Sequence, residues 1–199
     1  MNTIVNIRLA TVGGQGGVLA SSVIAQAAFD AGLQVKKREV HGMSQRGGVV
    51  TSDVRFGPVV HSPMVPEGAV DILLGFEQGE ALRAVHDLRP GGVVIVNTQV
   101  IVPPIVATGK ASYPVNPLAT LREKASRVYA VDALKIAEDA GSVKAVSTVM
   151  VGALSAFVDF PEDAWLKAIR GKVPPKTVAL NERAFAAGRA VVQAASRGA

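Results

Sequence analysis

The chain has 199 residues, of which 49% are hydrophobic, and it carries a formal net charge of +5. It contains no cysteine, which excludes disulfides, thiolate nucleophiles and cysteine-ligated iron–sulfur clusters on this chain. Aromatic residues make up only 5% and the basic residues are spread along the sequence, so we do not expect nucleic acid binding.

Nothing in the sequence predicts a metal site or a membrane segment. His41, His61 and His86 are too scattered for the spacing of metal ligands. The N-terminus lacks a charged region followed by an apolar core, so it does not read as a signal peptide. Every apolar run is interrupted before it reaches the length of a bilayer. We therefore expect a cytoplasmic protein, organised as one domain over residues 1–199.

The first part of the chain predicts a strand, a glycine turn, a helix and a second strand. Residues 4–12 are rich in the apolar and β-branched types typical of a strand, and a glycine cluster follows at 13–17. Residues 18–31 are rich in alanine and predict a helix that Gly32 ends, and residues 34–40 predict the next strand. This order is typical of a right-handed βαβ unit.

The rest of the chain alternates strands with helices and ends in helices. Further strands are expected at 49–56, 70–74, 93–96 and 127–131, and helices at 78–86, 117–126, 133–140, 143–157, 161–170 and 177–195. Residues 89–92 predict a turn. Residues 59–61 leave room for a short return strand, and 100–117 predict an extended excursion with room for a strand near 111–113. The pattern predicts an α/β fold with a mostly parallel sheet, in a Rossmann-like three-layer arrangement with a helical C-terminal third.

The glycine cluster at 13–17 is the first candidate site. It occupies the position of the phosphate loop in a Rossmann fold, where amides at a helix N-terminus attract anions. Its spacing departs from G-x-G-x-x-G, because the last position, counted from Gly14, falls on Leu19. Glu39 lies near the place of a ribose-binding acid. Two interpretations stay open, a tight strand-to-helix turn with close helix packing or a contact with a ligand or partner. The residues concerned are Gly13, Gly14, Gln15, Gly16 and Gly17.

The loop at 41–48 is the second candidate site, because it concentrates polar side chains ahead of two glycines. We take His41 and Arg46 as candidate catalytic residues, His41 as a proton relay and Arg46 as part of an anion-binding nest. Contacts to a ligand or a partner are expected from Ser44, Gln45, Gly47 and Gly48. Alternatively, Arg46 pairs with Glu39 or with an acid of a partner, and the glycines only make a turn. We expect this loop and the 13–17 cluster to meet at one end of the sheet.

The two motifs together, G-G-Q-G-G at 13–17 and E-V-H-G-M-S-Q-R-G-G at 39–48, resemble the gamma-type domain of the 2-oxoacid:ferredoxin oxidoreductases. The most similar branch is that of the indolepyruvate oxidoreductases, in which this domain is a separate beta subunit. The resemblance continues through Met150-Val151-Gly152-Ala153-Leu154 and into the last helix, so it covers nearly the whole chain. Ser147 departs from the family pattern, in which an asparagine is usual.

The resemblance implies a subunit of a thiamine diphosphate-dependent enzyme that oxidatively decarboxylates 2-oxoacids, here indolepyruvate and other arylpyruvates, to aryl-acetyl-CoA. It implies that a larger alpha subunit binds the thiamine diphosphate, the Mg²⁺ and the iron–sulfur clusters, and that this chain alone binds no cofactor. CoA is implied as a co-substrate. Electrons are expected to leave through the alpha subunit to an acceptor protein or a nicotinamide. The present chain is expected to complete the active site and the assembly of a heteromer.

Three other interpretations stay open. In the first, the chain is the gamma subunit of a pyruvate, 2-oxoglutarate or phenylglyoxylate oxidoreductase. In the second, it is a stand-alone nucleotide-binding module that uses the 13–17 turn. In the third, it is a purely structural subunit. Saturable binding of NAD or ATP by the isolated chain would favour the nucleotide-binding module. Loop substitutions that change association alone would favour the structural subunit.

Overall fold

The computed structural model describes residues 3–42 and 47–197, with the backbone alone at 104 and 105. Its centre is a six-stranded sheet in the order β2-β3-β1-β4-β5-β6. The strands are β1 Val5–Val12, β2 Gln34–His41, β3 Val49–Gly57, β4 Val70–Gly75, β5 Leu88–Asn97 and β6 Val128–Val131. The pairs β1–β4, β4–β5 and β5–β6 are parallel, which confirms the prediction of a mostly parallel sheet.

Strand β3 departs from the predicted arrangement, because it runs antiparallel to both of its neighbours, β1 and β2. Residues 42–48 are the whole connection from β2 to β3, and strands joined by so short a loop pair as an antiparallel ribbon. The ribbon places β3 between β1 and β2. The predicted βαβ unit at the N-terminus therefore lacks adjacent strands, and β2 becomes an edge strand of the sheet.

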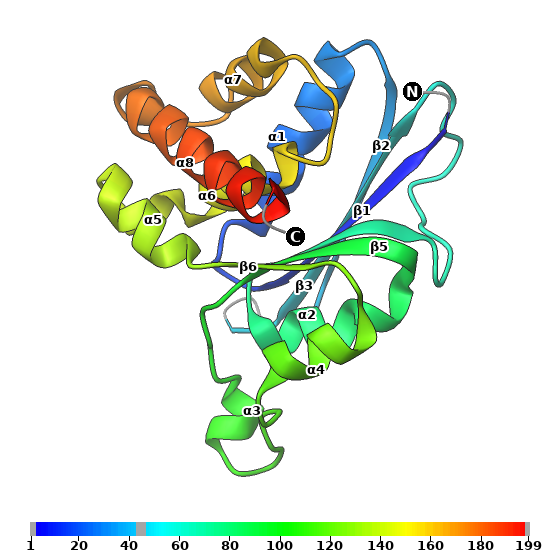
Figure 1. Ribbon diagram of the computed structural model, residues 1–199, viewed down its shortest axis with the longest axis vertical. Coiled ribbons are helices and arrows are strands. Elements are labelled where there is room, and N and C mark those ends of the chain that lie inside the picture. The colour runs from blue at the N-terminus through cyan, green and yellow to red at the C-terminus, as the bar shows by residue number, and fades with distance from the viewer. Residues whose placement is uncertain (1–2, 43–46, 198–199) are drawn as a thin grey trace.

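Helices cover both faces of the sheet and complete the predicted three-layer arrangement (Figure 1). One face carries α1 and the C-terminal helices, and the other carries α2 and α4. The helices of the first face are α1 Gly17–Asp30, α5 Ala133–Ala140, α6 Val146–Ser155, α7 Glu162–Arg170 and α8 Val178–Arg197. Those of the second face are α2 Gln78–Ala84 and α4 Pro117–Lys124. Short 3-10 turns adjoin α2, α6 and α8, at Val85–Asp87, Val143–Ala145 and Pro175–Thr177.

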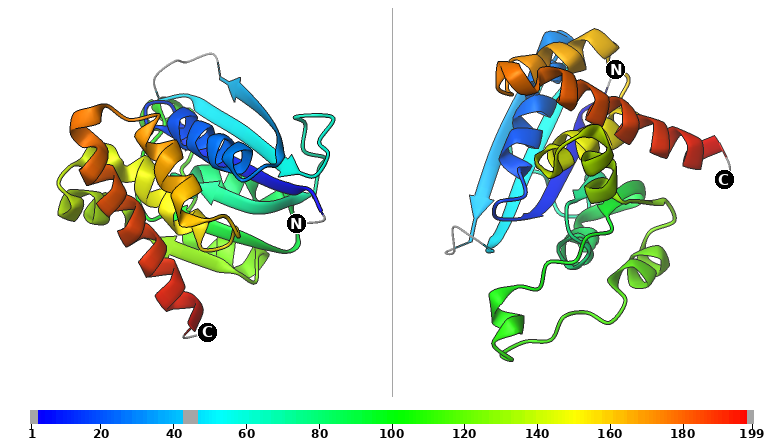
Figure 2. Two further views of the ribbon diagram at one scale, coloured as in Figure 1. Left: turned by 90° about the horizontal axis from the view of Figure 1, so that it is seen from above. Right: turned by 90° about the vertical axis from the view of Figure 1, so that its left-hand side faces the viewer.

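Between β5 and α4, residues 98–116 extend away from the body as a segment that we call the arm (Figure 2). The arm contains the short helix α3 Pro104–Ala107 and, as far as the structure describes it, no strand. The strands for which the sequence left room near 111–113 and at 59–61 do not form. Residues 59–61 would return along β3, which already has β1 and β2 on its two sides.

The turn predicted at 89–92 lies inside β5 and forms a bulge in it. The pairing with β4 shifts from Val70 opposite Leu88 to Ile72 opposite Val93. The register therefore moves five residues along β5 for two along β4, and the extra residues of β5 are not paired with β4. The predicted turn is therefore wrong, because residues 89–92 belong to β5, which continues through the bulge.

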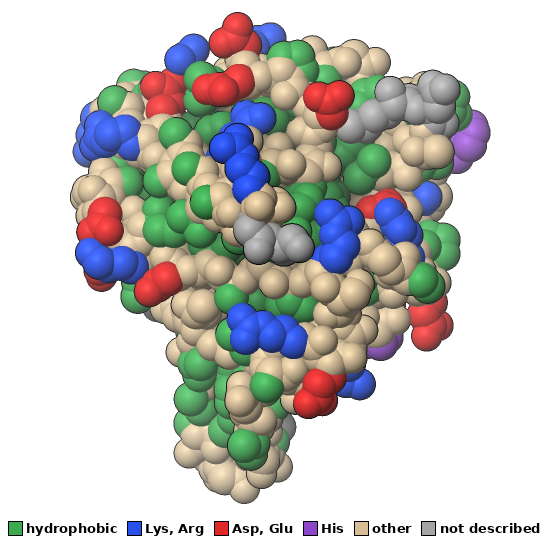
Figure 3. Space-filling model, in the orientation of Figure 1, with side chains coloured by type: hydrophobic (Ala, Val, Ile, Leu, Met, Phe, Trp, Pro, Cys, Tyr) green, Lys and Arg blue, Asp and Glu red, His purple; other side chains and the backbone are tan. Residues whose placement is uncertain are grey.

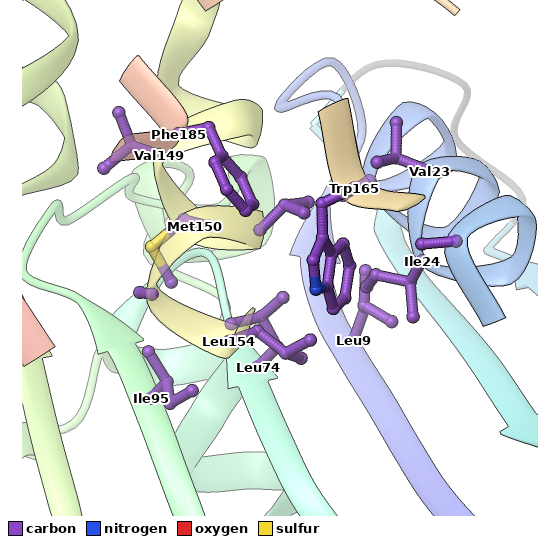
Figure 4. Close-up of a cluster of buried hydrophobic side chains, with 14 of the residues drawn as sticks. Leu9, Val23, Ile24, Leu74, Ile95, Val149, Met150, Leu154, Trp165 and Phe185 are labelled. Carbon is purple, nitrogen blue, oxygen red and sulfur yellow. The ribbon is translucent and has the colours of Figure 1, made fainter. Parts of the chain in front are cut away.

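The main core lies between the sheet and the C-terminal helices, with α6 at its centre. All 10 residues of α6 are buried, as its apolar sequence predicted. Trp165 of α7 packs against Phe185 of α8, with 6.0 Å between the ring centroids (Figure 4). Helices α6 and α8 cross at two glycines, since a Cβ at Gly152 would lie 2.1 Å from Phe185 O and one at Gly188 would lie 2.1 Å from Val149 O. This close crossing holds α6, whose first turn borders the candidate site.

Candidate functional site

The two glycine-rich segments meet beyond the carboxyl ends of the parallel strands. Gly13 N–H donates to Gly48 O at 2.8 Å, and Gly47 N–H donates to Gly13 O at 3.5 Å. These bonds confirm the prediction that the 13–17 turn and the 41–48 loop come together at one end of the sheet. Gly47 and Gly48 thus have a backbone role in joining the two segments.

A cleft of about 620 Å³ opens beside this contact. The 13–17 turn forms its floor, the arm contributes Gln99 and Ile101, and the segment from α5 to α6 contributes Leu134, Lys144 and Ser147. Open α/β sheets bind their ligands in crevices of this kind, outside the carboxyl ends of the strands. The position of the cleft therefore marks it as the candidate functional site.

The backbone conformation of the turn and its close contact with β1 both require glycine. Gly14 and Gly16 adopt positive φ angles of 102° and 82°, which residues with a side chain rarely tolerate. A Cβ at Gly17 would lie 2.6 Å from Thr11 Cγ2, so glycine lets α1 pack closely on β1. The turn is thus a tight strand-to-helix connection with close helix packing, which was one of the two interpretations left open.

The side-chain amide of Gln15 connects the ends of two strands through its oxygen and its nitrogen. Its Oε1 accepts from Val12 N–H at 2.8 Å, and its Nε2 donates to Phe76 O at 2.9 Å. Asn97, a site residue that sequence reasoning missed, is fully buried, donates to the same Phe76 O at 3.2 Å and accepts from Ala133 N–H at 3.2 Å. The two amides hold the ends of β1, β4 and β5 beneath the cleft. The signal for Asn97 was an amide placed directly at the end of an apolar strand.

One side of the cleft carries groups suited to an anion. Helix α1 begins without a side-chain cap, so its first N–H groups are available to an anionic ligand. Ser147 is 3% exposed and lines the cleft, and among the described residues its hydroxyl has no hydrogen-bond partner. This hydroxyl is not among the buried polar atoms that lack a partner, so it is open to the cleft, where it can donate to a ligand acceptor. Lys144 adds a positive charge to the same wall.

Lys144 was not predicted as a site residue, and Ser147 was noticed only as a departure from a family pattern. Both follow Ser142, whose Oγ accepts from Lys144 N–H at 3.3 Å and starts the 3-10 turn ahead of α6. In the sequence, Gly141 and Ser142 indicate that a helix starts after them. The sequence does not show that this helix starts beside the 13–17 turn.

His41 lies on the edge strand β2, and it is not among the described residues that line the cleft. Its side chain is 55% exposed, and its Nε2 lies 3.5 Å from Glu39 Oε2. Glu39 also accepts from Lys37 Nζ at 2.7 Å and from Ser21 Oγ at 3.3 Å. Burial alone would raise the pKa of Glu39, but the hydrogen bond and charge of Lys37 lower it overall. Because β3 separates β2 from β1, Glu39 is not placed as a ribose-binding acid.

The remaining predicted residues fall on the segment 43–46, which lies outside the described residues. They are Ser44, Gln45 and Arg46. The anion-binding role of Arg46, its alternative ion pair with Glu39, and the contacts of Ser44 and Gln45 therefore stay predictions.

A second polar group lies at the start of α2 and reaches the arm. Glu77 is 1% exposed, and its Oε2 accepts from Glu80 N–H at 3.0 Å as the cap of α2. Its Oε1 accepts from the Tyr113 hydroxyl and, at 3.3 Å, from Ile101 N–H. Burial, followed by the hydrogen bond to Glu77, raises the pKa of Tyr113 above its usual range. Burial also raises the pKa of Glu80, although its ion pair with Arg83 opposes the change.

Within residues 3–42 and 47–197, no group of three or more His, Cys, Asp or Glu side chains is placed to hold a metal ion. No helix in that part of the chain is long and apolar enough to cross a bilayer. The fold and the cleft together define an α/β protein of the class whose ligand crevice lies at the carboxyl ends of the strands. The sequence matches the family described as pyruvate ferredoxin/flavodoxin oxidoreductase over residues 6–191, and the chain belongs to this family.

Individual relatives are similar over nearly their whole length. The chain is 43% identical over 188 residues to the indolepyruvate oxidoreductase subunit IorB of Thermococcus kodakarensis, covering 92% of this chain and 93% of that protein. It is 31% identical to the 2-oxoglutarate synthase subunit KorC of Methanothermobacter thermautotrophicus, covering 96% of each. The solved gamma subunit of a keto/oxoacid ferredoxin oxidoreductase from Geobacter sulfurreducens matches with a TM-score of 0.72 and 27% identity, covering 96% of this chain and 99% of that one. The chain therefore has the size and fold of a separate small subunit of such an oxidoreductase complex.

Proposed function

We propose that this chain is the beta (gamma-type) subunit of an indolepyruvate oxidoreductase, which oxidatively decarboxylates indolepyruvate and other arylpyruvates to aryl-acetyl-CoA. The similarity to the Thermococcus kodakarensis subunit supports this substrate class, because the two chains are 43% identical over nearly the whole length of each. A 2-oxoglutarate oxidoreductase is the second candidate, and the 31% identity to KorC supports it less strongly.

In this proposal a larger alpha subunit carries the thiamine diphosphate, the Mg²⁺ and the iron–sulfur clusters. The alpha subunit also passes electrons to an acceptor protein or a nicotinamide. The present chain has no cysteine to ligate iron–sulfur clusters, which supports placing the clusters on the partner. Its contribution is to ligand binding and assembly, in a complex that we expect to work in the cytoplasm.

Within the complex, we assign the cleft to the phosphate-bearing part of CoA. The observation that carries this assignment is the uncapped start of α1 beside the Ser147 hydroxyl, which lines the cleft next to Gly16. Phosphates bind at helix N-termini because the first N–H groups lack partners and the helix dipole favours negative charge. Lys144 adds charge, and Leu19 and Ile101 offer apolar surface to the less polar remainder of the ligand.

The 41–48 loop adjoins the cleft through Gly47. In the proposal, Arg46 and the amides of Gly47 and Gly48 hold a carboxylate or a CoA phosphate. His41, exposed on β2, faces the partner subunit and moves a proton near the keto oxygen of the substrate. Purified complexes with Arg46→Ala or His41→Ala should still assemble but turn over more slowly. Assembly and turnover that both match the wild type would remove the catalytic role.

The substrate class is tested by purifying the chain with its partner from the native host. The readout is 2-oxoacid-dependent reduction of a viologen dye, with indolepyruvate, phenylpyruvate, pyruvate and 2-oxoglutarate, each with and without CoA. Activity that depends on arylpyruvates and CoA supports the proposal, and activity with 2-oxoglutarate moves the chain to the second candidate. A chain with no partner and no activity contradicts both and favours a stand-alone nucleotide-binding module.

The assignment of the cleft is tested by Ser147→Ala in the purified complex. Loss of a hydroxyl that donates to a phosphate should raise the KM for CoA about tenfold, with the KM for the 2-oxoacid unchanged. Ser196→Ala is the matched control, because the Ser196 hydroxyl donates to Val192 O within its own helix at 2.9 Å, away from the cleft. A KM for CoA that is the same in both variants would show that CoA binds elsewhere.

A further inference from the structure

The carboxylate of Glu77 joins two places in the arm that are distant along the chain. Its Oε1 accepts from Ile101 N–H near the start of the arm and from the Tyr113 hydroxyl near the end. The neighbouring Gln78 holds the start of the arm as well, since its N–H donates to Gln99 O at 3.4 Å and its Nε2 donates to Thr98 O. Because Glu77 is itself fixed as the cap of α2, these bonds attach the arm to the body.

Among the residues of the arm whose side chains the structure describes, few are apolar anchors. Val100, Val102 and Val115 are exposed, Val115 at 95%. Lys110 is its only charged residue at neutral pH, and Figure 3 shows hydrophobic and uncharged side chains on the visible face of the lobe where the arm lies in Figure 1. A segment that buries little apolar surface depends on a few polar bonds for its position. The bonds to Glu77 and Gln78 are therefore decisive for where the arm lies.

The start of the arm is also a wall of the cleft. Gln99 and Ile101 line it, whereas neither Glu77 nor Tyr113 is among the described residues that do. Ile101 both lines the cleft and donates its N–H to Glu77. A change in the bond between Glu77 and Tyr113 is thus transmitted to the cleft through the backbone of Ile101.

The chemistry of the pair suits a permanent attachment. The Tyr113 phenol is protonated at neutral pH with its ordinary pKa near 10, and burial raises that pKa further. It is therefore a donor to the Glu77 carboxylate, and such charge-assisted bonds are stronger than neutral ones. The Tyr113 hydroxyl also accepts from Gly79 N–H at 3.1 Å. A Cβ at Gly79 would lie 3.0 Å from Tyr113 Cε2 and 3.2 Å from Glu77 Oε2, so the ring lies directly on the helix backbone.

We propose that Glu77 and Tyr113 are a positioning pair, which holds the arm against the body so that Gln99 and Ile101 form one wall of the ligand cleft. CoA as the ligand of that cleft rests on the proposed function, whereas the attachment of the arm by this pair does not.

Tyr113→Phe removes one hydroxyl and keeps the ring. Tyr129→Phe is the matched control, because Tyr129 packs on Phe157 with 4.9 Å between ring centroids, and its hydroxyl makes no hydrogen bond to the described residues. In the full chain, hydrogen–deuterium exchange of peptides covering 98–103 should become about tenfold faster in Tyr113→Phe and stay unchanged in Tyr129→Phe. Unchanged exchange at 98–103 in Tyr113→Phe overturns the proposal.

In the purified complex, Tyr113→Phe should raise the KM for CoA several-fold, with kcat and the KM for the 2-oxoacid unchanged. If Ser147→Ala raises the KM for CoA and Tyr113→Phe does not, the pair does not position the cleft and the proposal is overturned. If neither variant changes it, the assignment of CoA has failed, and the exchange rates decide whether the pair holds the arm.

Gly79→Ala is a second variant that separates positioning from folding. Alanine favours a helix more than glycine does, so this change should not unfold α2. Its methyl group should nevertheless displace the Tyr113 ring and make exchange at 98–103 faster, with no fall in the melting temperature. Slower or unchanged exchange would contradict the contact between Gly79 and the ring.

Discussion

The crossing of α6 and α8 offers a sharp test of the packing that supports the cleft. A Cβ added at Gly152 would lie 2.1 Å from Phe185 O and 2.9 Å from Phe185 C, and both atoms belong to the backbone of α8. Ordinary contacts begin near 3.4 Å. Gly152→Ala must therefore move the two helices apart by roughly 1 Å, since a backbone carbonyl cannot rotate away as a side chain can.

The expected cost follows from this geometry. Overpacking a core costs about 1–3 kcal/mol, and the upper value applies here because α6 is buried along all 10 of its residues. Replacing glycine by alanine within a helix offsets about 1 kcal/mol through helix propensity. The free energy of unfolding should fall by about 2 kcal/mol, which lowers Tm by about 4–8 °C for a chain of this size.

Urea unfolding followed by circular dichroism and tryptophan fluorescence measures this change. Trp165 is the only tryptophan in the sequence and lies in the same core, so its fluorescence reports on the packing. Gly171→Ala is the control, because a Cβ there would meet no atom closer than 3.5 Å, and its stability should stay within about 0.5 kcal/mol of the wild type. A Gly152→Ala protein as stable as Gly171→Ala would refute the close crossing.

Two further predictions concern buried charges. Arg8→Ala removes the guanidinium 2.7 Å from the buried carboxylate of Asp53, which keeps its second ion pair with Arg38. Urea unfolding should therefore show a loss of about 2 kcal/mol, above the loss for the exposed ion pair of Arg170; equal losses would contradict a buried network. The pKa of Glu80 is raised above 4.5 by burial, with Arg83 opposing, so its stabilising contribution is present below about pH 4.5 and is lost as the pH rises through the folded pKa. The unfolding free energy of Glu80→Gln relative to the wild type should therefore rise from about pH 4.5 towards neutral pH, and a constant difference would disprove the shift.

The local elements were predictable wherever their signals lie in neighbouring residues. The helix at 133–140 was predicted with its observed bounds, because Asp132 caps it by accepting from Lys135 N–H at 3.1 Å and Gly141 ends it at a φ of 113°. The strands at 70–75 and 128–131 were recognisable as short apolar runs. In each case the deciding contacts lie within a few residues along the chain.

The pairing of the strands was harder to predict, because it depends on which partners are free. Strand β3 was identified correctly as a strand, but its antiparallel place between β1 and β2 follows from the ribbon that it forms with β2. That insertion placed Glu39 and His41 on an outer strand, one strand further from the 13–17 turn than a Rossmann order would have put them. Neither side chain therefore lines the cleft, although both lie close in the sequence to Gly47, which does.

The sequence by itself determined most of the helices and strands, the glycines of the 13–17 turn and, through paired motifs, the family. It also determined that the chain has no thiolate ligand. Only the tertiary structure decided which side chains share the cleft, since Ile101, Lys144 and Ser147 reach it from segments far along the chain. The physical reason is that such contacts follow from sheet order and helix crossing, which arise from the packing of the whole chain and leave no local pattern.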